Sequence, residues 1–125
     1  MHRALVPLLA ALFLTGCNLE ESVAGLVRDE ESAGVTLTVE ECGTDDAENP
    51  YALVSMVSEE KEWGTVLFNV EMLNEDGVVI GQGSTSFRSV EPGKRYQTKV
   101  IISFPSEDPP KEPACEVDLE FASRQ

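Results

Sequence analysis

Residues 66–80 read VLFNVEMLNEDGVVI, and this stretch decides the fold class. Apolar side chains occupy every second position from Val66 to Met72, which is the period of a strand with one buried face. Asn74-Glu75-Asp76-Gly77 follows, and Asp-Gly between two apolar runs is a strong signal for a tight turn. The chain then returns as a second strand over residues 78–87. The stretch therefore predicts an antiparallel β-hairpin.

The same two-residue period continues on both sides of this hairpin. Further strands are expected at residues 35–40, 51–57, 96–104 and 115–121. The last of them has one apolar face and one acidic face. The apolar face is formed by Cys115, Val117, Leu119 and Phe121, and the acidic face by Glu116, Asp118 and Glu120. Turn signals recur every eight to twelve residues and no long helix is indicated. The pattern predicts an antiparallel β-sandwich of six to seven strands over residues 35–125.

The amino end has the layout of an export signal. A basic start at Arg3 precedes the apolar run Ala4–Leu14, which is shorter than the roughly 20 residues needed to span a bilayer. Leu14-Thr15-Gly16-Cys17 resembles the lipobox of bacterial lipoproteins. The resemblance implies cleavage before Cys17 and attachment of diacylglycerol to its sulfur, with palmitate-type acyl chains. An ordinary signal peptide followed by a chance cysteine is the alternative.

This resemblance also predicts where the protein resides and how the chain is divided. Residues 1–16 are expected to be the signal peptide, and residues 17–34 the lipidated amino terminus and a flexible tether. Two or three acyl chains give durable membrane anchoring. The expected location is extracytoplasmic, lipid-anchored in the cell membrane or the outer membrane. In Gram-negative lipoproteins an Asp after the cysteine favours the inner membrane, and this chain has Asn18 there.

The two remaining cysteines, Cys42 and Cys115, form an even pair once Cys17 carries lipid. Export places them in an oxidising compartment, where disulfides form and persist. We expect a Cys42–Cys115 disulfide, which closes a loop of over seventy residues and stabilises the fold by about 4 kcal/mol in the chain-entropy model. Two free buried thiols are the alternative. The bond would join the end of the first expected strand to the start of the last.

The segment from about Tyr51 to Phe104 resembles the FxLYD-type module, an immunoglobulin-like sandwich of bacterial and archaeal lipoproteins. The matching residues are Val70-Glu71-Met72-Leu73-Asn74, Gly77, Val78-Val79-Ile80-Gly81 and Pro92-Gly93. Val70, Leu73 and Asn74 depart from the Phe, Tyr and Asp of the family. The resemblance implies a sandwich fold and carries no catalytic residues over to this chain.

Charge and residue usage exclude several classes of function. The 125-residue chain carries 9 basic and 23 acidic residues, and only Arg3 is removed with the signal, so the mature net charge is −15. Nucleic-acid phosphates and anionic lipid surfaces would be repelled. The one histidine, His2, lies in the signal, so the commonest general base is missing from the mature chain. We expect no enzymatic activity and no cofactor.

The acidic loop Asp45, Asp46 and Glu48 holds the candidate metal ligands, because dense carboxylates can bind Ca²⁺. It lacks the ligand spacing and central glycine of an EF-hand, so a solvated loop also explains it. The leading hypothesis is a non-catalytic binding or structural module of the cell envelope, whose partner is another envelope protein recognised by strand addition. The alternative is a divalent-cation (Ca²⁺) binding surface protein.

Overall fold

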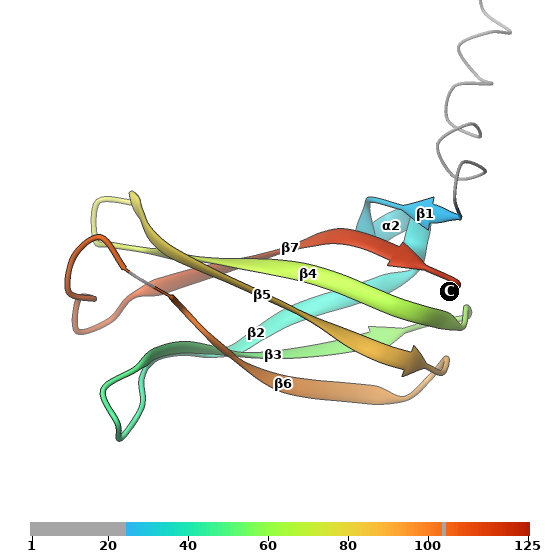
Figure 1. The fold of residues 1–125 in the computed structure, drawn as a ribbon, viewed down its shortest axis with the longest axis horizontal. Helices are drawn as coiled ribbons and strands as arrows, with labels where there is room; N and C mark the ends of the chain where they lie inside the picture. Colours follow the sequence, from blue (N-terminus) through green and yellow to red (C-terminus); the bar gives the residue numbers. More distant parts are fainter. Residues whose placement is uncertain (1–24, 104) are drawn as a thin grey trace, which may run out of the picture.

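The protein folds as an antiparallel β-sandwich of seven strands, as the sequence predicts. The computed structural model describes residues 25–103 and 105–125. One sheet has the strand order β1-β7-β4-β5 and the other β2-β3-β6 (Figure 1). The elements are β1 (Leu26–Val27), α2 (Glu30–Ala33), β2 (Val35–Thr44), β3 (Pro50–Ser58), β4 (Trp63–Leu73), β5 (Val79–Val90), β6 (Arg95–Ile101) and β7 (Ala114–Ser123). In the described ranges no helix is long and apolar enough to cross a bilayer.

The β4–β5 hairpin forms where the sequence places it. Its turn is closed by Gly77, whose N–H donates to the Asn74 carbonyl at 3.0 Å and whose φ of 81° suits glycine. The Asn74 side-chain oxygen also accepts from the amides of Asp76 and Val78. The inward face of β4 is completely buried and forms the centre of the core, with Val66, Phe68, Val70 and Met72 each at 0% exposure.

Two glycines of β5 allow the other sheet to approach closely. A Cβ on Gly81 would lie 2.6 Å from Cγ2 of Ile102, and one on Gly83 would overlap the Ile101 carbonyl oxygen. The segment after β6 then hydrogen-bonds to β5, since the Ser103 amide donates to the Gln82 carbonyl at 3.1 Å. The β5–β6 side of the sandwich is therefore closed by backbone contact.

The sandwich begins earlier than expected, so the tether prediction is wrong for residues 26–34. Strand β1 pairs with the end of β7, and Val27 and Ala33 are buried. The one-turn helix α2 is capped by Asp29, whose carboxylate accepts from the Ser32 amide at 3.0 Å, and ends at Gly34 with φ 70°. Strand β1 has two residues and helix α2 has four, which is too short for a hydrophobic period to show in the sequence. Residues 1–24, including Cys17, lie outside the described part of the chain.

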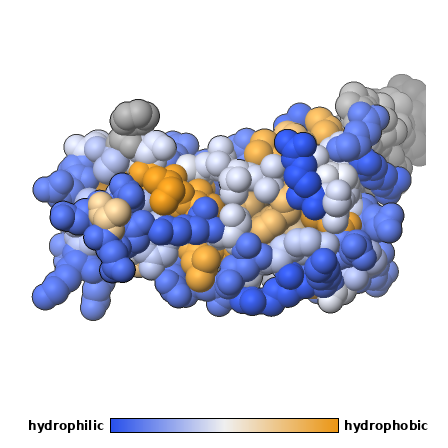
Figure 2. All heavy atoms as spheres, turned by 60° about the horizontal axis from the view of Figure 1, so that its bottom comes forward, coloured by the Kyte–Doolittle hydropathy of each residue, from blue (hydrophilic) through white to orange (hydrophobic). Residues whose placement is uncertain are grey.

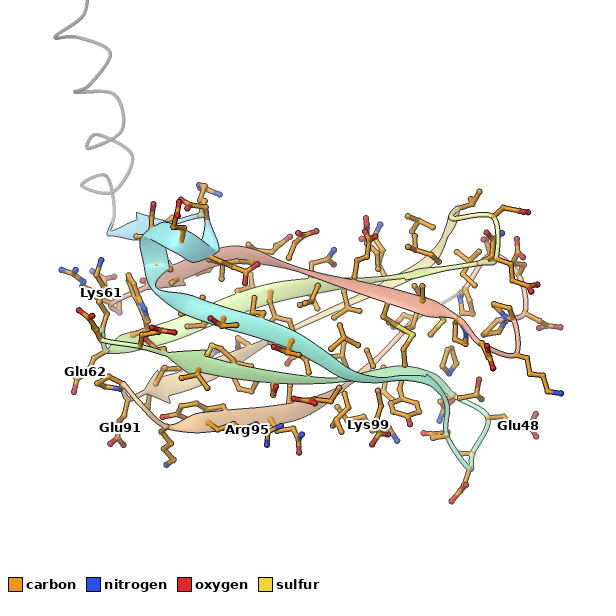
Figure 3. All side chains as sticks on the ribbon, turned by 180° about the vertical axis from the view of Figure 1, so that it is seen from behind. Glu48, Lys61, Glu62, Glu91, Arg95 and Lys99 are labelled. Carbon is orange, nitrogen blue, oxygen red and sulfur yellow. A yellow bond between two sulfur atoms is a disulfide. The ribbon has the colours of Figure 1, made fainter. Side chains whose placement is uncertain are left out.

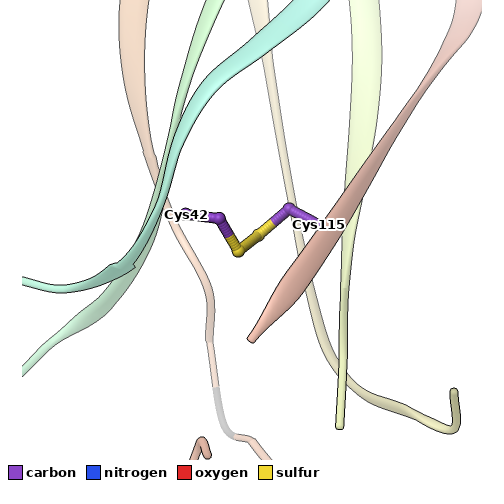
Figure 4. The surroundings of a disulfide bond; sticks show 2 residues. All are labelled: Cys42 and Cys115. Carbon is purple, nitrogen blue, oxygen red and sulfur yellow. A yellow bond between two sulfur atoms is a disulfide. The ribbon is translucent and has the colours of Figure 1, made fainter. Parts of the chain in front are cut away.

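The predicted Cys42–Cys115 disulfide is present (Figure 4). Cys42 lies near the end of β2 and Cys115 near the start of β7, with their Cα atoms 5.9 Å apart. Because β2 and β7 belong to different sheets, the bond fastens the two layers to each other.

The apolar face expected on the last strand is interrupted. Leu119 pairs with Phe68, but Phe121 pairs with Leu67, so Glu120 is an extra residue in β7. Phe121 consequently shares the outward face of Leu67, while Ala122 turns into the core with 0% exposure. The prediction of one continuous apolar face is thus right from Cys115 to Leu119 and wrong at Phe121.

Candidate functional site

The side of the sandwich between β2 and β7 is open over part of its length. Strand β4 pairs with one edge of β7, whereas β1 covers the other edge only at Ala122 and Ser123. The stretch of β7 from Cys115 to Phe121 has no backbone partner on that side among the residues described. Figure 1 shows β1 and α2 next to the carboxyl-terminal end of β7. We call this stretch the open edge.

Side chains of the open edge that face the core are only partly covered. Val117 and Leu119 pack against the core but remain half-buried. Their direct neighbours on β4, Val70 and Phe68, are at 0% exposure. The difference follows from position, because β4 has a strand on each side and β7 lacks one along the open edge. The open edge therefore exposes both backbone polar groups and the margin of the apolar core.

The outward face of the same strand carries unneutralised negative charge. Glu116, Asp118 and Glu120 are exposed, and no hydrogen-bond or ion-pair partner is found for them among the described residues. Glu116 lies directly opposite Glu71 of β4. Like charges in directly opposed positions of a sheet repel each other, so this face favours a cationic neighbour.

The three-stranded sheet presents a different outward face, on which the carboxylates are already paired. The Glu40 carboxylate accepts a hydrogen bond from the Ser55 hydroxyl at 2.6 Å and pairs with Arg95 at 2.9 Å. Both contacts lower the pKa of Glu40, and the Ser55 hydrogen bond has the larger effect. The Tyr51 hydroxyl donates to Glu41 at 2.8 Å, which raises the pKa of Tyr51. Figure 3 shows Arg95 and Lys99 along this side of the molecule. On this face Glu40 and Glu41 are thus already bonded, whereas Glu116, Asp118 and Glu120 of β7 are not.

The predicted metal-ligand loop is organised by hydrogen bonds within the protein. One oxygen of Asp45 accepts from the amides of Ala47 and Asn49, at 3.0 and 2.8 Å, and the other pairs with Lys99 at 2.7 Å. These contacts, the Lys99 bond first, lower the pKa of Asp45. Asp46 and Glu48 are exposed, and Glu48 lies on the outlying loop of Figure 3. In the described ranges, no three His, Cys, Asp or Glu side chains are placed to hold a metal ion together.

Trp63 closes the end of the sandwich opposite to this loop. It is 2% exposed, and its indole N–H donates to the Ala33 carbonyl at 3.1 Å. Lys61 Nζ and Arg124 Cζ lie 5.8 and 5.7 Å from its ring centre. An open cleft of about 580 Å³ adjoins it, lined by Glu62, Trp63, Gly64, Ser89, Val90, Glu91 and Arg124. Every polar contact of the indole is internal, so Trp63 is part of the packing at this end.

Apolar surface gives a weaker indication of a binding site. The large exposed apolar side chains among the described residues are Val78, Val79 and Ile101, at 56%, 39% and 45% exposure. The face in Figure 2 is mainly hydrophilic, with apolar groups in separate patches. Isolated exposed apolar residues are ordinary on a protein surface. The open edge is the more distinctive feature.

Comparison of the chain with protein-family models, with curated proteins and with solved structures finds no match. The class of the protein is therefore defined by its fold, an antiparallel β-sandwich fastened by one disulfide. The lipobox and the FxLYD-type resemblance stay predictions. Strand addition also stays a hypothesis, and the sequence did not indicate which strand would have an open edge. The alternation of acidic residues at Glu116, Asp118 and Glu120 was the signal available for it.

Proposed function

We propose that the protein is a lipid-anchored component of the cell envelope whose sandwich is a non-catalytic module that binds another protein by strand addition. The observation that carries this proposal is the open edge. An unpaired strand edge offers a row of N–H and C=O groups to an extended segment of a partner, and exposed core side chains offer it apolar contact. Both are found together on β7 between Cys115 and Leu119.

The anchor is supported by the lipobox-like sequence ending at Cys17. Gly25 lies eight residues further along the chain, a distance of at most about 28 Å when fully extended. From Gly25 the chain enters the sandwich at the end that holds β1, α2 and the carboxyl terminus (Figure 1). Anchoring at Cys17 would thus keep this end next to the bilayer. The loop that carries Glu48 lies at the opposite end (Figure 3).

Metabolic labelling with palmitate tests the anchor. The native chain should incorporate the label and sediment with membranes, and Cys17→Ser should do neither, because the acceptor sulfur is lost. The matched control is the double variant Cys42→Ala/Cys115→Ala, which should keep the label. An unlabelled native chain, or equal labelling of Cys17→Ser, would contradict the proposed anchor.

Site-specific photo-crosslinking in intact cells tests the binding function. A photoreactive residue replaces Asp118 on the open edge in one variant and Glu75 in the β4–β5 turn in the other, and both positions are exposed. Strand addition predicts a recurrent crosslink to one envelope protein from position 118 and none from position 75. Identical products at the two positions, or none at position 118, would count against a binding function for this edge.

A further inference from the structure

We infer that the open edge accepts an extended segment of a partner protein in which apolar side chains alternate with basic ones. This inference rests on the proposed strand addition and adds the position, the length and the chemistry of the added strand. Its observations are the unpaired edge of β7, the half-buried side chains beneath it and the unneutralised carboxylates beside it.

The other three edges of the sandwich are less suited to an added strand. At β5, the amides of Ser103 and Ser106 already donate to the Gln82 and Ile80 carbonyls. Strand β6 lies against β5 so closely that its Ile101 carbonyl leaves no room for a side chain on Gly83. Strand β2 has a register shift with β3 between Val39 and Glu41, and its Glu40 carboxylate is already bonded to Ser55 and Arg95. A bulge of this kind interrupts edge-to-edge pairing.

The limits of the open edge determine the length of the segment. The Cys42–Cys115 bond bounds it at one end and β1, which begins its pairing at Ala122, bounds it at the other. The extra residue Glu120 ends the regular alternation after Leu119. About five residues, or about 17 Å of strand, can therefore pair without a break.

The two faces of β7 determine the side chains of the segment. Positions that face the core would lie beside Val117 and Leu119, which are half-buried and need an apolar neighbour to be covered. Positions that face outward would lie beside Glu116 and Asp118, and Glu120 would lie just past the last paired residue. Directly opposed residues of neighbouring strands have Cβ atoms about 4.5–5.5 Å apart, within reach of a lysine or arginine. Alternation of apolar and basic residues satisfies both faces at once.

A fluorescent peptide of alternating valine and lysine residues is the probe, titrated into the full-length protein and followed by anisotropy. Two control peptides have the same length: one has its valines and lysines in separate blocks, and one has glutamate in place of lysine. The alternating peptide should bind best. Hydrogen exchange of the bound protein should slow at residues 115–119 and not at β2, β5 or β6.

Matched charge variants separate the edge from general electrostatic attraction. The variant Glu116→Gln/Asp118→Asn/Glu120→Gln removes the three outward carboxylates, and Glu75→Gln/Asp76→Asn/Glu112→Gln removes three exposed ones on loops. The first should weaken binding about tenfold at low salt, because three exposed carboxylates at or next to the bound segment are lost, and the second should leave it within about twofold.

Equal binding of the block peptide, equal weakening by both triple variants, or exchange protection away from β7 would overturn the inference. Absence of binding by the alternating peptide would do the same. These failures are distinguishable from failure of the proposed function, because palmitate labelling and the crosslink from position 118 do not depend on the peptide. A retained crosslink with no peptide binding would reject the alternating chemistry and leave strand addition in place.

Discussion

Removal of the disulfide tests the link between topology and stability. The perturbation is Cys42→Ala/Cys115→Ala, which changes both cysteines so that no free thiol remains. The bond spans a sequence separation of 73 residues and joins strands of different sheets. In the chain-entropy model a loop of this length stabilises the fold by about 4 kcal/mol at 25 °C, through the restricted unfolded chain. Since a domain of this size is stable by about 5–15 kcal/mol, the loss would be a large fraction of the total.

Urea unfolding of the native chain and of the double variant measures the loss. The midpoint should fall, and the denaturant slope should rise because the uncrosslinked unfolded chain exposes more surface. The same change should lower the melting temperature by roughly 15–30 °C. Val117→Ala is the matched control, since it removes half-buried apolar volume next to the bond and keeps the crosslink. A loss below about 1 kcal/mol, or one no larger than that of Val117→Ala, would refute the entropic argument.

Two further substitutions test the packing of the sheets and the loop charge. Gly83→Ala should lower the melting temperature clearly more than Gly43→Ala. A Cβ at position 83 would overlap the Ile101 carbonyl oxygen, whereas position 43 has open space. Similar losses in the two variants would contradict the close approach of β5 and β6. The pKa of Asp45 is lowered by Lys99, so its stabilising contribution is present above the unfolded pKa and declines as the pH falls through the lower folded value. Thermal melts from pH 7 to pH 2 should show this decline in the native chain and a weaker one in Asp45→Asn, and parallel curves would exclude it.

Most of the fold follows from the local sequence pattern, because a strand with one buried face must alternate apolar and polar side chains. Val66 to Met72 shows the pattern most clearly, and all of its inward positions are fully buried. The disulfide could be predicted for a different reason, since the expected lipidation of Cys17 left one cysteine pair in a compartment expected to be oxidising. Neither inference needed knowledge of strand order.

The features that the sequence does not predict depend on partners distant in the chain. Glu120 becomes an extra residue only because β7 must keep Leu119 beside Phe68 and place Ala122 beside Val66. Asp45 is paired by Lys99, 54 residues away. The open edge depends on strand order, which places β7 outside β4 and leaves, within residues 25–103 and 105–125, only the two residues of β1 beyond it. Alternation of apolar and polar residues predicts that a segment is a strand, but it does not predict which strands pair with it.

If an extended basic segment binds the open edge as proposed, the carboxylates of β7 contribute to specificity in two ways. An open strand edge is a risk for self-association, because it can pair with the same edge of another copy. In such a pair Glu116, Asp118 and Glu120 of one copy would approach the same residues of the other, and like charges would oppose the contact. A basic segment meets attraction at the same positions, so one set of side chains disfavours the wrong partner and favours the right one. Anchoring through Cys17 would concentrate copies on one membrane surface, where this discrimination matters most.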